Sequence, residues 1–250
     1  MAIYNSLKIL NDDEIKELFE IPSIDPKDRK LLFEITPEDK AYLDNQAIIA
    51  NKVNYILQVG YFRAARKFYK FSFVDIQDDV QYVLKTHFSN TSHLPASTTK
   101  DKHYAAQKAI MTIYKYKRYD ASFETELGRQ AKRLSKRDLT PRFIFDELLH
   151  YCEQYRIIRP KYSTLQSLVS KAISREENRL TTKLATLLDK DSRTILDSLL
   201  TKNDTISGLA LLKKDPKGMA TKEMEAELEK QRNIAHLFEQ SKQIIPALSI

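Results

Sequence analysis

The sequence contains few of the residues that interrupt helices or crosslink chains. Its 250 residues include four Gly, eight Pro and a single Cys. One cysteine excludes an intramolecular disulfide, so the cysteine usage gives no indication of an oxidising compartment. Because Gly and Pro are scarce while Leu, Lys, Ala, Ile and Glu are abundant, the composition favours helices joined by short connections.

Long apolar stretches are also missing. No run approaches the roughly 20 consecutive apolar residues that a membrane-spanning helix needs. The first residues, Met1 to Lys8, lack the basic region, apolar core and small-residue cleavage site of a secretory signal. We therefore expect a cytoplasmic protein that has no membrane partner.

The motifs of common catalytic sites are absent as well. The sequence has no Gly-rich phosphate loop, no Gly-x-Ser-x-Gly, no cysteine with an evident histidine partner and no assignable set of carboxylates. The five histidines and Cys152 show no paired metal-ligand spacing. We expect no enzymatic activity, no metal site and no cofactor.

Several local patterns mark the starts of helices. Asn11 precedes three acidic residues and is a predicted N-cap, and Thr36 is another, since Pro37 follows it at the first helical position. Ser163 and Gln166 have the spacing of a capping box and are predicted to open a long helix. With 42% apolar residues the chain can bury a sizeable core.

The sequence therefore predicts an all-α fold. We expect a multi-helix bundle with two packed helical lobes, a first lobe at residues 1–120 and a second lobe at residues 121–250. No repeat with a period of 20 to 50 residues runs through the chain, so a helical solenoid is not indicated.

The segment 51–63 is expected to be the central helix. Its apolar residues share one helical face at three- and four-residue spacings: Val53, Ile56, Leu57, Gly60 and Tyr61. Asn54 and Gln58 lie off that face. The pattern predicts an amphipathic helix that buries the apolar stripe.

Positive charge is unevenly distributed along the chain. The net charge is +7, but residues 1–45 carry six Lys or Arg and eleven Asp or Glu, which leaves +12 for the remainder. At the end of the central segment, four cations separated by aromatic residues follow one another without an acid: Arg63, Arg66, Lys67 and Lys70. Such a run can bind a polyanion, although the solvated end of a core helix would look the same.

Two further segments are basic. Residues 100–118 hold six cations and one acid, and several cations alternate with tyrosines, which either stack on sugars and bases or belong to the core. Residues 121–137 place cations three or four positions apart on one helical face, where each like-charged pair costs roughly 0.2–0.5 kcal/mol. A phosphate backbone would relieve this repulsion, and so would Glu124 or Glu126.

The order of residues in the segment 51–63 resembles the signature NRLGFAxQLxYLR of Tn3-family transposases. Asn51, Leu57, Gln58, Tyr61 and Arg63 match it. Further motifs of that family are matched in the same order at residues 33–39, 155–166, 193–200 and 209–216. The chain thus resembles the amino-terminal DNA-binding region (DUF4158-type) of a Tn3-family transposase.

This resemblance implies a helical module that recognises the terminal inverted repeats of a mobile element in double-stranded DNA. Transposases of the family cut and join DNA at an acidic, metal-binding site on a ribonuclease H-like fold, far downstream of the matched region. The resemblance therefore implies that the catalytic domain is absent from this chain. The rest of a transposase, or a second copy forming a homodimer, would be a further partner.

The resemblance and the basic clusters together define the candidate DNA-binding residues. They are Lys52, Arg63, Arg66, Lys67, Lys70, Lys100, Lys102, His103, Lys115, Lys117, Arg118, Arg129, Lys132, Arg133, Lys136 and Arg137. Two other interpretations stay open: a helical protein-interaction or regulatory protein derived from a transposase fragment, and an inactive remnant that folds poorly.

Overall fold

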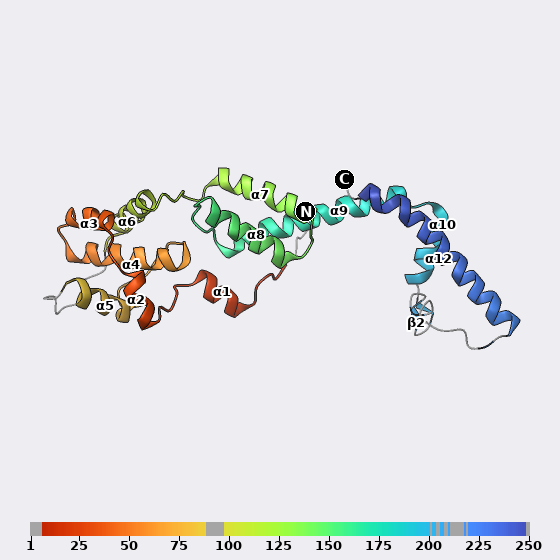
Figure 1. Ribbon diagram of the computed structural model, residues 1–250, viewed down its shortest axis with the longest axis horizontal. Helices are drawn as coiled ribbons and strands as arrows, with labels where there is room; N and C mark the ends of the chain where they lie inside the picture. Colours follow the sequence, from red (N-terminus) through yellow and green to blue (C-terminus); the bar gives the residue numbers. More distant parts are fainter. Residues whose placement is uncertain are drawn as a thin grey trace. The chain divides into compact units, whose positions relative to one another are not determined.

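The computed structural model describes residues 7–88, 98–200, 202–203, 206–207, 210, 218 and 220–248. In these residues the protein is all-α, as the sequence predicts, with eleven helices and one pair of two-residue strands (Figure 1). The elements are α1 (Asp12–Phe19), α2 (Pro26–Leu32), α3 (Pro37–Asp44), α4 (Ile49–Ala65), α5 (Gln77–His87), α6 (Lys100–Ile113), α7 (Ala121–Ser135), α8 (Pro141–Gln154), α9 (Tyr162–Leu187), α10 (Lys190–Leu200), β1 (Lys202–Asn203), β2 (Ile206–Ser207) and α12 (Thr221–Leu248).

The chain divides into two compact units, Met1–Ile173 and Ser174–Ile250. This division falls within α9, whereas the expected lobes meet at residues 120 and 121. The first unit holds two hydrophobic clusters, and each draws residues from both sides of residue 120: Leu10 and Phe19 belong to the second cluster, and Ile158 packs against the first. The arrangement as two packed lobes with a boundary at residue 120 stays a prediction.

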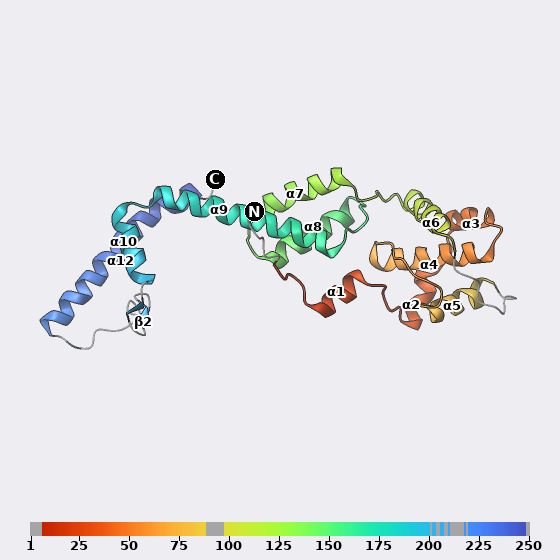
Figure 2. The same cartoon turned by 180° about the vertical axis from the view of Figure 1, so that it is seen from behind.

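The first cluster is built around α4. This helix contacts α2, α5 and α6, and α3 contacts α6. Both views place α3 and α6 on one side of α4 and α2 and α5 on the other (Figures 1 and 2). Neighbours on several sides bury every residue from Val53 to Phe62.

The prediction that α4 is amphipathic is therefore wrong. Asn54 and Gln58, expected to lie off the buried face, are each only 1% exposed. Their side chains meet His103 of α6, because Asn54 Oδ1 lies 3.0 Å from His103 Nδ1 and Gln58 Nε2 lies 3.1 Å from the same atom. His103 thus compensates for the burial of Asn54 Oδ1 and of the Gln58 side chain, whereas Asn54 Nδ2 is buried without a partner among the described residues.

The two predicted N-caps are confirmed. The Asn11 side chain accepts from the Glu14 amide, and the Glu14 carboxylate accepts from the Asn11 amide, which forms a full capping box. Thr36 and Asp39 form the same reciprocal pair at the start of α3, with Pro37 following the cap. These starts depend on neighbouring residues alone.

The capping box predicted at Ser163 is wrong. The helix α9 already begins at Tyr162, so Ser163 lies inside it. The amide of Gln166 instead donates to the Leu7 carbonyl O at 2.9 Å, and the Tyr162 hydroxyl accepts from the Ile9 amide at 3.2 Å. Both side chains therefore hold the amino-terminal segment against α9.

The second cluster joins α7, α8, the first part of α9 and the amino-terminal segment. The helices α7 and α8 contact each other. Cys152 lies in this cluster, where burial raises the pKa of its thiol to about 12. The cysteine is therefore a protonated core residue at neutral pH.

The second unit contains the last part of α9, α10, the two strands and α12. The helices α10 and α12 contact each other, and Ser192 Oγ lies 3.0 Å from His236 Nε2. The strands pair antiparallel, with Lys202 opposite Ser207.

None of the helices in the described parts of the chain combines the length and the apolar character required to cross a bilayer.

Candidate nucleic-acid interface

Arg63, a candidate DNA-binding residue, is directed into the protein. Its Nη1 donates to the Leu32 carbonyl O at 2.9 Å, and its Nη2 lies 3.1 Å from Asp39 Oδ2 and 2.6 Å from the Tyr114 hydroxyl. Asp39 also accepts from the hydroxyls of Tyr114 and Tyr55. The positive charge of Arg63 is thus paired within the first cluster, and its assignment to a DNA-binding surface stays a prediction.

His103 is also engaged inside the protein. Besides its contacts with Asn54 and Gln58, its Nε2 lies 3.0 Å from the Tyr69 carbonyl O. Both ring nitrogens therefore have partners within the fold, and the imidazole holds α6 and the segment after α4 together. We assign it a structural role.

Lys67 occupies a position between these inward residues and the surface. Its Nζ donates to the Phe19 carbonyl O at 2.6 Å and lies 5.1 Å from the ring centroids of Phe19 and Tyr69. Burial lowers the pKa of Lys67, and the nearby positive charges of Arg159 and Lys161 lower it further. Positive charge is therefore concentrated around this side chain.

A large cavity adjoins Lys67, which we call the basic cavity. Its volume is about 1040 Å³. Among the described residues that line it, none is acidic and five are cationic: Lys67, Lys108, Arg118, Arg159 and Lys161. The other lining residues are Phe68, Tyr104, Gln107, Met111, Tyr119, Ile158, Pro160 and Thr164.

Backbone hydrogen bonds bring together the three segments that supply these cations. The Arg159 amide donates to the Arg66 carbonyl O at 3.1 Å. The Lys117 amide donates to the Arg156 carbonyl O at 2.7 Å, and the Ile158 amide donates to the Lys117 carbonyl O at 2.9 Å. Residues far apart in the sequence are thereby fixed at one place.

The loops that lead into the basic cavity have unusual backbone conformations. Within the described parts of the chain, three non-glycine residues have positive φ: Arg66 at 54°, Lys115 at 58° and Arg156 at 53°. Each precedes a cation of the cavity by one to three residues. Each of these residues lies at or directly after the end of a helix, where a left-handed residue commonly terminates the helix, so the conformation sets the direction of the following segment.

Internal partners compensate the charge of the cavity only in part. Arg159 Nη2 lies 3.1 Å from Glu153 Oε1, and its Nη1 donates to the Leu18 carbonyl O at 3.2 Å. Lys67 has a carbonyl partner, which does not cancel its charge. Several cations in one cavity without an acid on its wall attract an anion.

The helix α7 presents the second group of exposed cations. Arg129, Lys132, Arg133, Lys136 and Arg137 are exposed. Arg129 pairs with Glu126, whereas the other four form no ion pair with any residue that the structure describes. Since α7 ends at Ser135, Lys136 and Arg137 lie at and after the helix end rather than on the predicted continuous face.

Comparison with known proteins identifies the family. Residues 9–172 match the model of a family described as a domain of unknown function (DUF4158). The chain belongs to this family. The match contains α1 to α8 and the first part of α9, and with them the basic cavity and the cations of α7. The comparison with curated proteins finds no match.

The structure brings some of the candidate residues of this DUF4158 region together. Lys67 and Arg118 line the basic cavity, whereas Lys70, Lys100 and His103 line an adjoining pocket. The remaining candidates line neither space; of those outside α7, Lys102, Lys115 and Lys117 are exposed, and Lys52 and Arg66 are half-buried.

Sequence reasoning missed three cations of the cavity in the DUF4158 region. Lys108 lies in a basic segment but is not among the candidates, and Arg159 and Lys161 flank Pro160 in a sequence typical of a simple turn. The useful signal is the basic turn itself, since a turn with cations on both sides of a proline presents two charges at one point.

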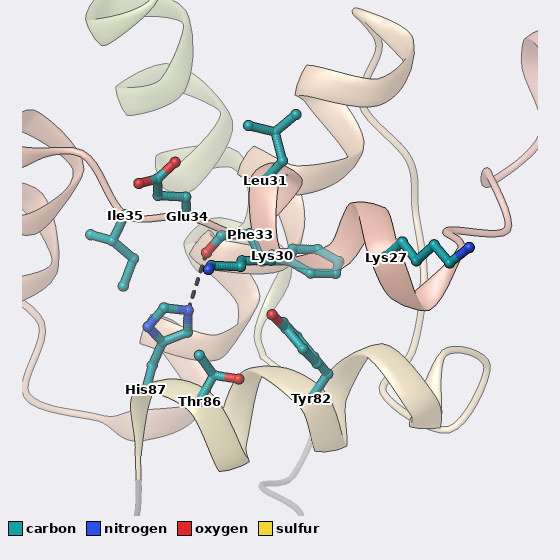
Figure 3. Close-up of a pocket in the computed structure, with 9 residues that line it drawn as sticks. All are labelled: Lys27, Lys30, Leu31, Phe33, Glu34, Ile35, Tyr82, Thr86 and His87. Atoms are coloured by element: carbon teal, nitrogen blue, oxygen red, sulfur yellow. Dashed lines mark hydrogen bonds between the residues drawn. The ribbon is translucent and has the colours of Figure 1, made fainter.

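A further cavity of the DUF4158 region, of about 560 Å³, lies between α2 and α5. Figure 3 shows Lys27, Lys30 and His87 around it, with His87 directed at the Phe33 carbonyl O, 3.1 Å from Nε2. Burial lowers the pKa of His87, so its ring is neutral at pH 7. Glu34 also lines this cavity, which therefore suits an anion less well than the basic cavity does.

The described residues of the DUF4158 region and of the second unit contain no group of three or more His, Cys, Asp or Glu arranged to hold a metal ion.

Proposed function

We propose that this DUF4158 region binds double-stranded DNA and holds its phosphate backbone with the basic cavity and with the cations of α7. The observation that carries the proposal is the basic cavity, where five cations from three segments meet and no acid is found among the described lining residues. Cations at such a site neutralise phosphates and release counterions, which supplies affinity and orientation.

The resemblance to Tn3-family transposases supports a narrower proposal. On that basis the DNA is a terminal inverted repeat, and the cutting chemistry belongs to a catalytic domain outside this chain, so this chain is not itself an enzyme. Its further partners are the rest of a transposase or a second copy. A cytoplasmic location follows from the same proposal.

Three pairs of charge reversals test the DNA-binding proposal. Lys108→Glu with Lys161→Glu changes the basic cavity, and Lys132→Glu with Arg133→Glu changes α7. Lys40→Glu with Lys85→Glu is the matched control, because these exposed lysines lie on α3 and α5 and line neither the basic cavity nor its adjoining pocket. Each pair changes the net charge by the same amount, so a general charge effect would appear in all three.

The measurement is a gel shift over a series of salt concentrations, with terminal inverted-repeat DNA and a shuffled duplex. We expect the cavity and α7 pairs to weaken binding on the order of tenfold to a hundredfold, and to lower the salt slope by about 0.9 for each phosphate that the variant no longer neutralises. The control pair should bind like the original chain. A preference for the inverted repeat would support the narrower proposal.

Equal binding by all three variants would contradict the proposal. In that case the protein-interaction function becomes the better explanation, and a feature of the second unit favours it: the long helix α12 exposes Leu228, Phe238 and Ile245. Binding that is insensitive to salt, or absent, is the expected result for a regulatory protein that docks onto another protein.

A further inference from the structure

A second, more aromatic space adjoins the basic cavity, and we call it the aromatic pocket. Its volume is about 450 Å³. Its lining residues are Phe68, Tyr69, Lys70, Phe71, Thr98, Lys100, His103, Tyr104 and Gln107. Phe68, Tyr104 and Gln107 also line the basic cavity, so the two spaces share a wall.

The aromatic rings of the pocket differ in how closely they pack against core residues. Phe71 packs edge-on against Tyr61 and His103, at centroid distances of 5.5 and 5.4 Å. Tyr104 is 46% exposed and has no aromatic neighbour within the described residues, but Lys100 Nζ lies 5.9 Å from its ring centroid. Tyr104 therefore presents a free ring beside a cation.

The polar groups of the pocket leave hydrogen-bonding capacity for a ligand. His103 is already engaged through both ring nitrogens. The Tyr69 hydroxyl is buried and has no hydrogen-bond partner in the described part of the chain, but it is closed off from solvent and so offers no contact to a ligand that enters from outside. The Gln107 side chain can both donate and accept at the shared wall.

The charged side chains that line the pocket carry positive charge. Lys70 and Lys100 are exposed at its lining, and no acid is found among the described residues that line it. Its ligand therefore combines an aromatic, planar part with neighbouring negative charge. A nucleotide of a DNA strand has both.

We propose that the aromatic pocket accepts a single unstacked nucleobase of the DNA whose phosphates lie in the basic cavity. The inference rests on the proposed DNA-binding function and deepens it. The base stacks on Tyr104, while Lys70 and Lys100 neutralise the phosphates on either side. Stacking on an aromatic ring is tolerant of base identity, because every base has a π-face.

The proposal predicts which DNA the protein prefers. Moving a base out of a paired stack costs a few kcal/mol, and the cost is smallest for a base that is mismatched or unpaired. The protein should therefore bind a duplex with one unpaired nucleotide more tightly than the same duplex fully paired. The difference in affinity comes from the contact between the unpaired base and the pocket, because both duplexes make the same phosphate contacts.

The test uses the full chain and two fluorescein-labelled duplexes of the same sequence, one fully paired and one with a single unpaired thymine. Tyr104→Ala is the test variant. Tyr155→Ala is its matched control, because Tyr155 is 49% exposed and does not line the pocket. We expect the original chain and the control to prefer the unpaired duplex about tenfold, and Tyr104→Ala to lose this preference.

A second measurement identifies the contact directly. The unpaired thymine is replaced by 5-iodouracil, which crosslinks to a neighbouring aromatic side chain on irradiation, and the crosslinked peptide is mapped after trypsin digestion. We expect the crosslink in the peptide His103 to Lys108, which contains Tyr104.

The outcomes separate the two proposals. Binding of both duplexes with equal affinity, or a crosslink found only outside the pocket, overturns the nucleobase pocket and leaves the DNA-binding function intact. No complex with either duplex overturns the DNA-binding function itself. A preference that survives in Tyr104→Ala also counts against the pocket.

Discussion

The basic run at the carboxyl end of α4 and the basic run on α7 look alike in the sequence but are used differently by the fold. In the first, Arg63 pairs with the buried Asp39, and Lys67 donates to a backbone carbonyl. In the second, Lys132 and Arg133 are exposed and have no ion-pair partner among the described residues. Clusters of cations in a sequence therefore show where charge is present, and only the fold shows whether it is available.

The difference has a physical cause in the partners that each region meets. A guanidinium can leave solvent only if an acid and further acceptors replace the water it loses. Asp39 provides this for Arg63, and Asp79 does the same for Arg29, with the Tyr61 hydroxyl donating to Asp79 at 2.7 Å. The cations of α7 that lack such a partner stay in solvent.

The largest difference in stability between the two runs is expected when Arg63 is removed. The variant Arg63→Ala leaves the buried Asp39 without its cation, and we expect the free energy of unfolding to fall by about 3–5 kcal/mol. The measurement is urea denaturation followed by circular dichroism. Arg133→Ala, an exposed cation of α7, should change stability by no more than about 0.5 kcal/mol.

Similar small losses in both variants would show that Arg63 is not a structural residue. If Arg63→Ala also folded normally and lost DNA binding, the residue would return to the interface that the sequence predicts for it.

The glycines of the two helices extend the comparison to packing. A Cβ added at Gly60 of α4 would collide with the buried Phe33 ring, whereas at Gly128 of α7 it would meet only Leu168 Cδ2 at 3.7 Å, an ordinary contact. We expect Gly60→Ala to destabilise by about 1–3 kcal/mol through overpacking. Gly128→Ala should stabilise by up to about 1 kcal/mol, because alanine favours the helix.

The critical result is that the change in the free energy of unfolding, measured by the same urea denaturation, has opposite signs for the two substitutions. A stabilising effect at both positions would mean that the Phe33 ring can make room for the added Cβ, which contradicts the tight packing around Gly60.

These comparisons show what the sequence could and could not predict. The helix starts at Asn11 and Thr36 were predictable, since a cap and its partner lie three residues apart. The all-α fold followed from composition and periodicity. The burial of Asn54 was not predictable, because its partner His103 comes from a distant helix.

The residues of the basic cavity were likewise only partly predictable from the sequence. Its cations come from residue 67, residues 108–118 and residues 159–161, and backbone contacts between distant loops bring them together. A search for basic runs finds the first two segments and passes over Arg159 and Lys161. It also selects Arg63, whose acid partner lies 24 positions earlier in the chain.

His87 is a further inward-directed group, and its ring contacts a backbone carbonyl rather than an acid among the described residues. Burial lowers its pKa below the ordinary 6.5, and the hydrogen bond to the Phe33 carbonyl offsets this only in part. The unfolded chain therefore binds a proton on His87 at a pH where the folded chain does not. Stability contributed by the neutral ring is complete above pH 6.5 and decreases as the pH falls below that value.

We expect the free energy of unfolding of the original chain to decrease, on account of His87, by at most about 1.4 kcal/mol per pH unit between its folded pKa and 6.5. His87→Gln keeps an amide donor for the carbonyl but cannot take up a proton, so its stability should depend less on pH below 6.5. Urea denaturation of both proteins from about pH 5 to pH 8 measures the difference. Parallel curves would show that His87 has the same pKa in the folded and unfolded chains. The fold would then not shield its ring from solvent.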